Sequence, residues 1–318
     1  MKSLGKDLSW ELPVRSATRV ADVERLEQPN EALECWRYSP VDEIDWERYQ
    51  GTPSSCADDI WEQGMEIHDG IGELILNRPA KLNAMNAKFF EELPIAIEIL
   101  EAESVVQVIV IRANGPHFSA GLDLYDMAPG SQKIQAAKDI EPLQRGFLAL
   151  ATTSKPTLAA INGYCIGGGL DLVAACDIRM ASQSAIFSLR EVRIGIVADL
   201  GSLALLADVM SLPTLTEIAL TGRDLDANEA QRIGLVQTLC ATPEELTQAV
   251  TTLARQIQAN PPLAVQATKS LLVQQRTQHL LQHLQLAASN NVALMQSQDM
   301  REAINALIEK RQPHYHGN

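Results

Sequence analysis

The stretch INGYCIGGGLDLVAACDIRMAS, residues 161–182, contains three consecutive glycines just before LDLVAACD, where a helix is expected to begin. Glycines at such a junction leave backbone N–H groups at the positive end of a helix, which suits an anion or a developing oxyanion. The spacing differs from the dinucleotide-binding GxGxxG pattern, and the chain has no GxxxxGK phosphate loop. Asp171, two residues after the last glycine, is either a functional acid or an acid that complements the helix dipole.

The segments around this stretch predict an α/β fold. MEIHDGIGELILNRP, residues 65–79, is typical of a β-hairpin because two alternating segments flank the turn dipeptide DG. VQVIVIRA (106–113), TLAAIN (157–162) and DIRMAS (177–182) predict further short strands. Strands that alternate with helices along the chain indicate an α/β architecture.

Helices are expected both inside the α/β region and after it. Asn83 is expected to open a helix that runs through AKFFEELPIAIEILEAE, and Pro94 would split or kink it. After Pro261 the chain is expected to be mainly helical. We therefore divide the chain into an N-terminal extension (1–62), an α/β core (63–260) and a helical C-terminal region (261–318).

The extension differs in composition from the rest of the chain. Residues 1–62 hold 14 of the 40 acidic residues and all four tryptophans. Pure disorder does not normally carry four tryptophans, so this segment is expected to dock on its own chain or on a neighbouring subunit. Its function is left open.

The composition of the whole chain excludes several functional classes. With 318 residues and a net charge of −14, the protein is expected to be soluble and to bind neither nucleic acid nor membranes. No apolar run is long enough to cross a bilayer, and no signal or transit peptide is recognisable, so a cytoplasmic location is expected. The five cysteines lack a CxxC pair and indicate reduced thiols. They are Cys35, Cys56, Cys165, Cys176 and Cys240.

A second candidate loop is HFSAGLDLYDM, residues 117–127, which follows an expected strand. A Ser-Ala-Gly turn at a strand exit lets the backbone approach a ligand closely and offers free N–H donors. The alternative is an ordinary connection between a strand and a helix. The candidate binding residues here are Ser119, Ala120, Gly121, Leu122 and Asp123.

The third candidate stretch, REVRIGIVADLGSLALLA at residues 190–207, places two acids among apolar residues. Glu191 is either a functional acid or part of a surface ion-pair cluster with its neighbours Arg190 and Arg193. Asp199 is either a buried functional acid or the N-cap of the apolar helix that follows. The surrounding apolar residues favour burial, which raises the pKa of a carboxyl toward a value useful in proton transfer.

Other catalytic patterns are missing from the sequence. There is no GxSxG elbow and no HExxH motif, so hydrolase and zinc-protease chemistry lack a nucleophile or ligands. The six histidines are scattered and are interpreted as structural or solvated. Lys269 is a possible phosphate contact, although most lysines on helices are simply solvated.

Taken together, these stretches resemble the crotonase superfamily of enoyl-CoA hydratases and isomerases, in order from about residue 65 to the end. The resemblance implies a spiral of ββα units and C-terminal helices that build a trimer, often a dimer of trimers. It rests on residues 72–86, 117–127, 155–182, 219–239 and 297–317.

The resemblance also implies an acyl-CoA thioester substrate and no separate cofactor. The thioester oxygen would be held by two backbone N–H groups, which the motifs assign to Leu122 and Gly168. Preorganised donors of this kind stabilise an enolate where its charge develops.

The acids point to one branch of the superfamily. Enoyl-CoA hydratases carry glutamates at the positions of Asp171 and Glu191. The combination of Asp171, Glu191 and Asp199 is similar to the motif of Δ3,5-Δ2,4-dienoyl-CoA isomerases. In this interpretation Glu191 and Asp199 transfer protons at C2 and C6, and Asp171 supports them. Enoyl-CoA hydration, Δ3-Δ2 isomerisation and a non-catalytic scaffold on the same fold stay open as alternatives.

Overall fold

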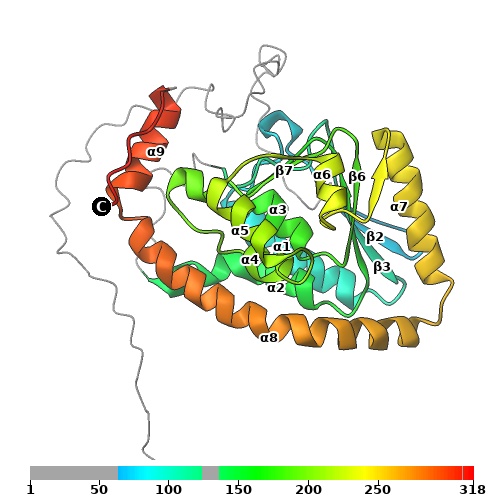
Figure 1. Ribbon diagram of the computed structural model, residues 1–318. Coiled ribbons are helices and arrows are strands. Elements are labelled where there is room, and N and C mark those ends of the chain that lie inside the picture. Colours follow the sequence, from blue (N-terminus) through cyan, green and yellow to red (C-terminus); the bar gives the residue numbers. More distant parts are fainter. Residues whose placement is uncertain (1–63, 124–135, 310) are drawn as a thin grey trace, which may run out of the picture.

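The computed structural model describes residues 64–123, 136–309 and 311–318 (Figure 1). The predicted extension, residues 1–62, and the end of the HFSAGLDLYDM motif lie outside the described residues. Within the described ranges, no helix is long and apolar enough to cross a membrane.

The chain enters the described fold through the predicted hairpin. Strands β1 (Met65–His68) and β2 (Ile71–Leu76) pair antiparallel, with His68 opposite Ile71. Asp69 and Gly70 both have positive φ angles, 49° and 77°. These angles are those that a two-residue hairpin turn requires, so the DG dipeptide predicted the turn correctly.

The main sheet has six strands in the order β1-β2-β3-β4-β6-β9, and every pair after the hairpin is parallel. All three strands predicted after the hairpin are present in it as β3, β4 and β6. A second sheet has the order β5-β7-β8. The remaining strands are β3 (Val108–Ala113), β4 (Thr157–Ile161), β5 (Tyr164–Ile166), β6 (Ile178–Ser182), β7 (Ile186–Ser188), β8 (Leu225–Asp226) and β9 (Thr238–Cys240).

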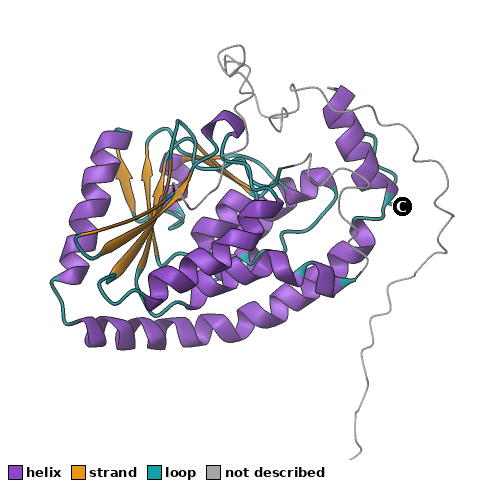
Figure 2. Cartoon of the chain, turned by 180° about the vertical axis from the view of Figure 1, so that it is seen from behind, coloured by secondary structure: helices purple, strands orange, loops and turns teal. Residues whose placement is uncertain are grey.

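Helices cover both faces of the main sheet (Figure 2). Val108 and Val110 of β3 belong to an apolar cluster that includes residues of α7, whereas the alternate residues Ile109 and Ile111 join the large cluster formed with the other helices. This alternation is the two-residue period of a strand. The helices of the core are α1 (Ala87–Ala102), α2 (Glu141–Thr152), α3 (Gly168–Ala174), α4 (Ser202–Leu206), α5 (Leu212–Thr221), α6 (Ala227–Arg232) and α7 (Pro243–Gln258).

The start of α1 differs from the prediction. Its N-cap is Asn86, whose side chain accepts a hydrogen bond from the Phe89 N–H, and α1 continues through Pro94 without a break. Asn83 instead adopts a left-handed conformation with φ 54°. Its side-chain amide donates to the carbonyls of Asn114 and His117, so it holds the loop after β3.

Helices α1 and α2 pack closely because a glycine lies at their contact. A Cβ atom on Gly146 of α2 would lie 2.6 Å from the side chain of Leu93 in α1. The rings of Phe89, Phe90 and Phe147 pack together beside this point, with centroids 5.3–6.3 Å apart. This contact fixes α2, which later supports the candidate site.

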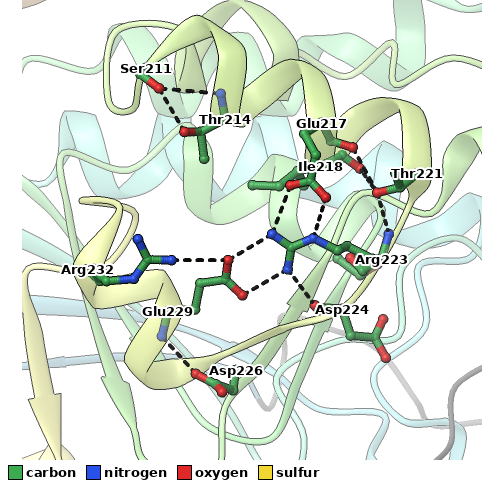
Figure 3. Close-up of polar contacts among 11 residues, drawn as sticks. Ser211, Thr214, Glu217, Ile218, Thr221, Arg223, Asp224, Asp226, Glu229 and Arg232 are labelled. Carbon is green, nitrogen blue, oxygen red and sulfur yellow. Dashed lines mark hydrogen bonds and ion pairs between the residues drawn. The ribbon is translucent and has the colours of Figure 1, made fainter.

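An arginine network connects α5 to α6 (Figure 3). The Arg223 guanidinium forms ion pairs with Glu217 of α5 and Glu229 of α6. Asp226 caps α6 by accepting from the Glu229 N–H. The neighbouring Asp224 is thereby held at a fixed place, where it binds Arg190.

The C-terminal region is helical, as predicted. Helix α8 (Pro262–Leu294) runs along the lower edge of the molecule in both views, and α9 (Gln298–Glu309) follows it (Figures 1 and 2). Lys269 of α8 is buried and forms an ion pair with Asp177 at 2.8 Å. It is therefore an internal tie between α8 and the core, neither a solvated lysine nor an open phosphate contact.

Candidate active site

The Ser-Ala-Gly loop is fixed by backbone hydrogen bonds on both sides. The Ser119 N–H donates to the Tyr164 carbonyl of β5 at 2.8 Å, and the Ala120 N–H donates to the Leu82 carbonyl at 3.0 Å. The Ser119 hydroxyl donates to the Asn83 carbonyl at 2.8 Å. Ser119 therefore fixes the path of the loop through its backbone and side-chain hydrogen bonds.

Gly121 brings this loop against the glycine-rich stretch. Its φ is 86°, and a Cβ at this position would lie 2.7 Å from the Ile166 carbonyl oxygen and 3.1 Å from the Gly168 nitrogen. Only glycine fits both the conformation and the space. The two loops that the sequence singled out are thus in direct contact.

Neither of the two predicted donor groups binds an acceptor in the part of the chain that the structure describes. The Met85 N–H donates to the Gly121 carbonyl and the Asp123 N–H to the Met85 carbonyl, so the Leu122 N–H between them points away from Met85. The Gly168 N–H opens α3, where a helix has no carbonyl four residues earlier to bind. Neither N–H binds an acceptor within the described part of the chain.

Asp123 lies at the end of the loop and forms an ion pair with Arg78. The terminal nitrogens Nη1 and Nη2 of Arg78 each lie 3.3 Å from Asp123 Oδ2, and Nη1 also donates to the Ala84 carbonyl at 2.6 Å. Both side chains are largely buried. The pair joins the loop to the segment before α1, and Arg78 was not predicted from the sequence.

Asp171 lies in the first turn of α3 and is 1% exposed. Its Oδ1 accepts a hydrogen bond from the Ser202 N–H at 2.8 Å, so it binds the first residue of α4. The pKa of Asp171 is raised to about 7, mainly by burial and to a lesser extent by the nearby charge of Asp199, and the Ser202 N–H hydrogen bond opposes the shift. The acid thus links two helices and can be neutral near pH 7.

Glu191 begins the 3-10 helix η5 (Glu191–Ile194) and is buried. A Cβ on Gly167 would lie 3.0 Å from Glu191 Oε1, which places this carboxyl beside the glycine-rich loop. Its Oε2 has no hydrogen-bond partner within the described residues. Burial raises the pKa of Glu191 well above its usual value, and the charge of Asp171 adds to the rise.

The alternative of a surface ion-pair cluster at Glu191 is wrong. Arg190 is buried as well and binds Asp224 with two nitrogen–oxygen distances of 2.6 and 2.8 Å. The guanidinium of Arg190 is therefore directed to Asp224. The pKa of Glu191 stays raised because this neighbouring positive charge only weakly offsets burial.

Asp199 is 8% exposed and lies in the loop before α4. The N-cap of α4 is Gly201, so the N-cap alternative for Asp199 is wrong. Its Oδ2 accepts a hydrogen bond from the Asn291 amide of α8 at 2.7 Å. Burial raises the pKa of Asp199 to about 6, while the hydrogen bond from Asn291 opposes the rise.

The three acids share one interior region. Asp171 and Asp199 both raise the pKa of Glu191, and Asp199 also raises that of Asp171, which requires that the carboxyls lie close enough to interact. Apolar side chains border this region; a Cβ on Gly168 would lie 3.0 Å from Met85 Sδ. Within the described residues, the arrangement combines two N–H donors that bind no acceptor with three buried carboxyls whose pKa values burial raises.

Two buried amides beyond the predicted set also support Asp199. The Gln144 amide of α2 donates to the Asp199 carbonyl at 2.7 Å and to the Leu284 carbonyl at 3.1 Å. Asn291 binds both Val197 and Asp199. In the sequence, the only feature that could have indicated Gln144 or Asn291 is that each is a polar residue on the otherwise apolar side of a helix.

A cavity of about 300 Å³ lies beside η5, between Arg193 and the C-terminal tail. Arg190 also lines it, and the Tyr315 hydroxyl donates to the Arg193 carbonyl at 2.7 Å. Because the Arg190 guanidinium is already paired with Asp224, we assign no ligand to this cavity.

A possible metal-ligand group lies on the β1–β2 hairpin. Among the described residues, Glu66, His68 and Glu73 are the group whose potential ligand atoms lie within 4.8 Å of one another. Arg112 forms ion pairs with both glutamates, so a cation already lies between these acids. We assign no metal to this group.

The sequence matches the family described as enoyl-CoA hydratase/isomerase over residues 66–318. A peroxisomal Δ(3,5)-Δ(2,4)-dienoyl-CoA isomerase from Arabidopsis thaliana is 39% identical over 253 residues, which cover 76% of this chain and 91% of the relative. A mitochondrial protein of the same name from Dictyostelium discoideum is 35% identical over 253 residues, covering 76% of this chain and 86% of the relative. Because these relatives are named for two organelles, the cytoplasmic location stays a prediction.

Solved structures of the family have the same fold. An enoyl-CoA hydratase/isomerase from Pseudoalteromonas atlantica T6c matches with a TM-score of 0.72 and 26% identity, covering 79% of this chain and 98% of that chain. The predicted crotonase-like α/β fold with a helical C-terminal region is thereby confirmed, whereas its role in trimerisation stays a prediction. The chain belongs to the enoyl-CoA hydratase/isomerase family, known as the crotonase family.

Proposed function

We propose that this protein converts 3,5-dienoyl-CoA to 2,4-dienoyl-CoA by moving a proton from C2 to C6 of the acyl chain, as part of fatty acid β-oxidation. The relatives named for this reaction support the proposal. The observation that carries it is the third buried acid, Asp199, which lies near Asp171 and Glu191. A second acid along an apolar channel is what a reaction at two distant carbons requires.

The first step is proposed to occur beside the glycine-rich loop. The N–H groups of Leu122 and Gly168 would bind the thioester oxygen, and the adjacent Glu191 carboxylate would remove the C2 proton. The electron pair of the C2–H bond then delocalises over the thioester oxygen and the diene. Preorganised N–H donors lower the energy of this dienolate, and losing one such donor typically costs about 10²–10³ in kcat.

The second step is proposed to occur at Asp199. Its carboxyl gives a proton to C6 while the thioester carbonyl re-forms, which leaves double bonds at C2 and C4. The cycle leaves Glu191 protonated and Asp199 ionised, so a proton must return from one to the other. Asp171 interacts electrostatically with both, and we assign it to support this return.

Asp199→Asn tests the proposal because the amide keeps the shape of the side chain but transfers no proton. The wild-type protein should convert a 3,5-dienoyl-CoA to a product that absorbs at longer wavelength, as conjugation with the thioester requires. The variant should lose this activity and keep its circular dichroism spectrum. Retained activity in the variant would remove Asp199 from the mechanism.

A parallel assay with crotonyl-CoA addresses the other chemistries. Loss of the crotonyl-CoA absorbance without any reaction of the diene would identify a hydratase. A 3-enoyl-CoA converted faster than the diene would identify a Δ3-Δ2 isomerase. A protein that acts on none of these substrates would favour the non-catalytic scaffold.

We also propose that α8 contributes to a homotrimer or to a dimer of trimers. Large apolar side chains on a surface helix indicate a covered interface. Leu271→Glu combined with Leu272→Glu should produce monomers in analytical ultracentrifugation, and an unchanged mass would contradict the proposal. The exposed leucines of α8 are Leu263, Leu271, Leu272, Leu281 and Leu286.

A further inference from the structure

We propose that Asn291 is a positioning residue that directs the transferable proton of Asp199 onto Oδ1. The inference rests on the proposed isomerase function. It concerns a side chain in α8, 92 residues away from Asp199 in the sequence. Asn291 itself is fully buried, with 0% of its surface exposed.

The orientation of the Asn291 amide is fixed by the backbone of Val197. Asn291 Oδ1 accepts the Val197 N–H at 2.9 Å, and Asn291 Nδ2 donates to the Val197 carbonyl at 2.9 Å. If the amide were flipped, its nitrogen would face the Val197 N–H and its oxygen would face the Val197 carbonyl, so neither hydrogen bond could form. The nitrogen must therefore lie on the side of the Val197 carbonyl.

The second hydrogen of the same nitrogen reaches Asp199. Nδ2 lies 2.7 Å from Asp199 Oδ2. Because an amide nitrogen only donates, Oδ2 must act as an acceptor in both protonation states of the acid. When Asp199 is protonated, its proton therefore lies on Oδ1, and Oδ2 is the carbonyl oxygen of the acid.

The groups that face Asp199 are consistent with this assignment. Asp171 from α3 and Glu191 from η5 interact with it electrostatically, and no hydrogen bond joins either of these described carboxyls to that of Asp199. His283 of α8 lines the same small opening as Asp199, whose other walls are mainly apolar. No other described side chain donates a hydrogen bond to the Asp199 carboxyl.

Gln144 of α2, which binds the backbone of the same loop, offers a matched control. Gln144 is also a buried amide, but its bonds go to the backbone carbonyls of Asp199 and Leu284. Gln144→Leu therefore loosens the loop without removing a donor from the carboxyl. Asn291→Leu removes that donor, and Asn291→Ala removes it with a smaller side chain.

Infrared spectroscopy of the full-length protein during a pH titration tests the proposal without using activity. The carbonyl band of protonated Asp199 is identified by its loss in Asp199→Asn. In the wild type this carbonyl, Oδ2, accepts a hydrogen bond, so its band should move to higher frequency in Asn291→Leu. In Asn291→Leu the midpoint of the Asp199 titration should also rise by about one to two pH units, which is the change in pKa that losing a hydrogen bond to a charged group usually causes.

The controls and outcomes separate this proposal from the proposed function. Gln144→Leu should change neither the band nor the midpoint, and Asn291→Ala should raise the midpoint if Leu prevents folding. An unchanged band and midpoint in both Asn291 variants would overturn the assignment. A wild-type protein without isomerase activity but with these infrared shifts would refute the proposed function alone.

Discussion

Replacing Asp171 by Asn should make the protein more stable at pH 8 and leave its stability near pH 4 unchanged. The Asn side chain keeps an oxygen that can accept the Ser202 N–H, now at 2.8 Å from Asp171 Oδ1. What it removes is a carboxyl that is 1% exposed. The expected gain therefore isolates the cost of holding a buried negative charge.

The size and pH range of the effect follow from the pKa of Asp171, which burial raises from 3.8 to about 7. Well below the unfolded pKa of 3.8 both the folded and the unfolded chain keep the proton, so the charge costs nothing, and near pH 4 the cost is still small. As the pH rises toward 7, the unfolded chain ionises first and the folded state loses stability. Above pH 7 the full penalty applies, about three pKa units or about 4 kcal/mol.

Calorimetry at pH values from 4 to 8 measures this difference. For a chain of this size, about 4 kcal/mol corresponds to a rise in Tm on the order of 5–10 °C at pH 8. The control is Asp208→Asn, which removes an exposed acid shortly after α4 and should leave Tm nearly unchanged at every pH. An Asp171→Asn variant that melts below the wild type at pH 8 would refute the reasoning.

Three further predictions concern the loops, the C-terminal region and the pH profile. Gly121→Ala should lower kcat by about 10²–10³, because the new Cβ would lie 2.7 Å from the Ile166 carbonyl and displace the donor loop. Steady-state kinetics would measure this loss, and an unchanged kcat would contradict the prediction. Lys269→Met should destabilise the fold by about 2–3 kcal/mol, measured by urea denaturation, because Asp177 loses its partner at 2.8 Å. Since burial raises the pKa of Asp199 to about 6 in the free protein, one limb of the pH profile of kcat/KM should lie near pH 6, and a flat profile between pH 5 and 7 would argue against its role.

The parts of the fold that the sequence predicted are those set by local patterns. The DG turn, the apolar strand β3 and the glycine-rich start of α3 each depend on a few neighbouring residues. The start of α1 was misplaced because Asn83 makes long-range hydrogen bonds to Asn114 and His117, which no local pattern reveals. Pro94 is accommodated within a continuous α1.

The candidate site was predictable to a similar extent. The apolar surroundings of Glu191 and Asp199 correctly indicated burial. The residues that hold this region come from distant segments: Asn291, which binds Asp199, comes from α8, and Asp224, which binds Arg190, comes from the connection after α5. Pairings across such distances arise only when the chain folds, so the residues that orient the acids escaped prediction.

Helix α8 offers a consequence for sensor design. Its 33 residues extend about 50 Å at 1.5 Å per residue. Lys269 anchors it to Asp177 near one end, and Asn291 anchors it to Asp199 near the other. A fluorescent label attached midway along α8 would therefore lie on the same continuous helix as the Asn291 amide that binds the Asp199 carboxyl, between its two anchored ends.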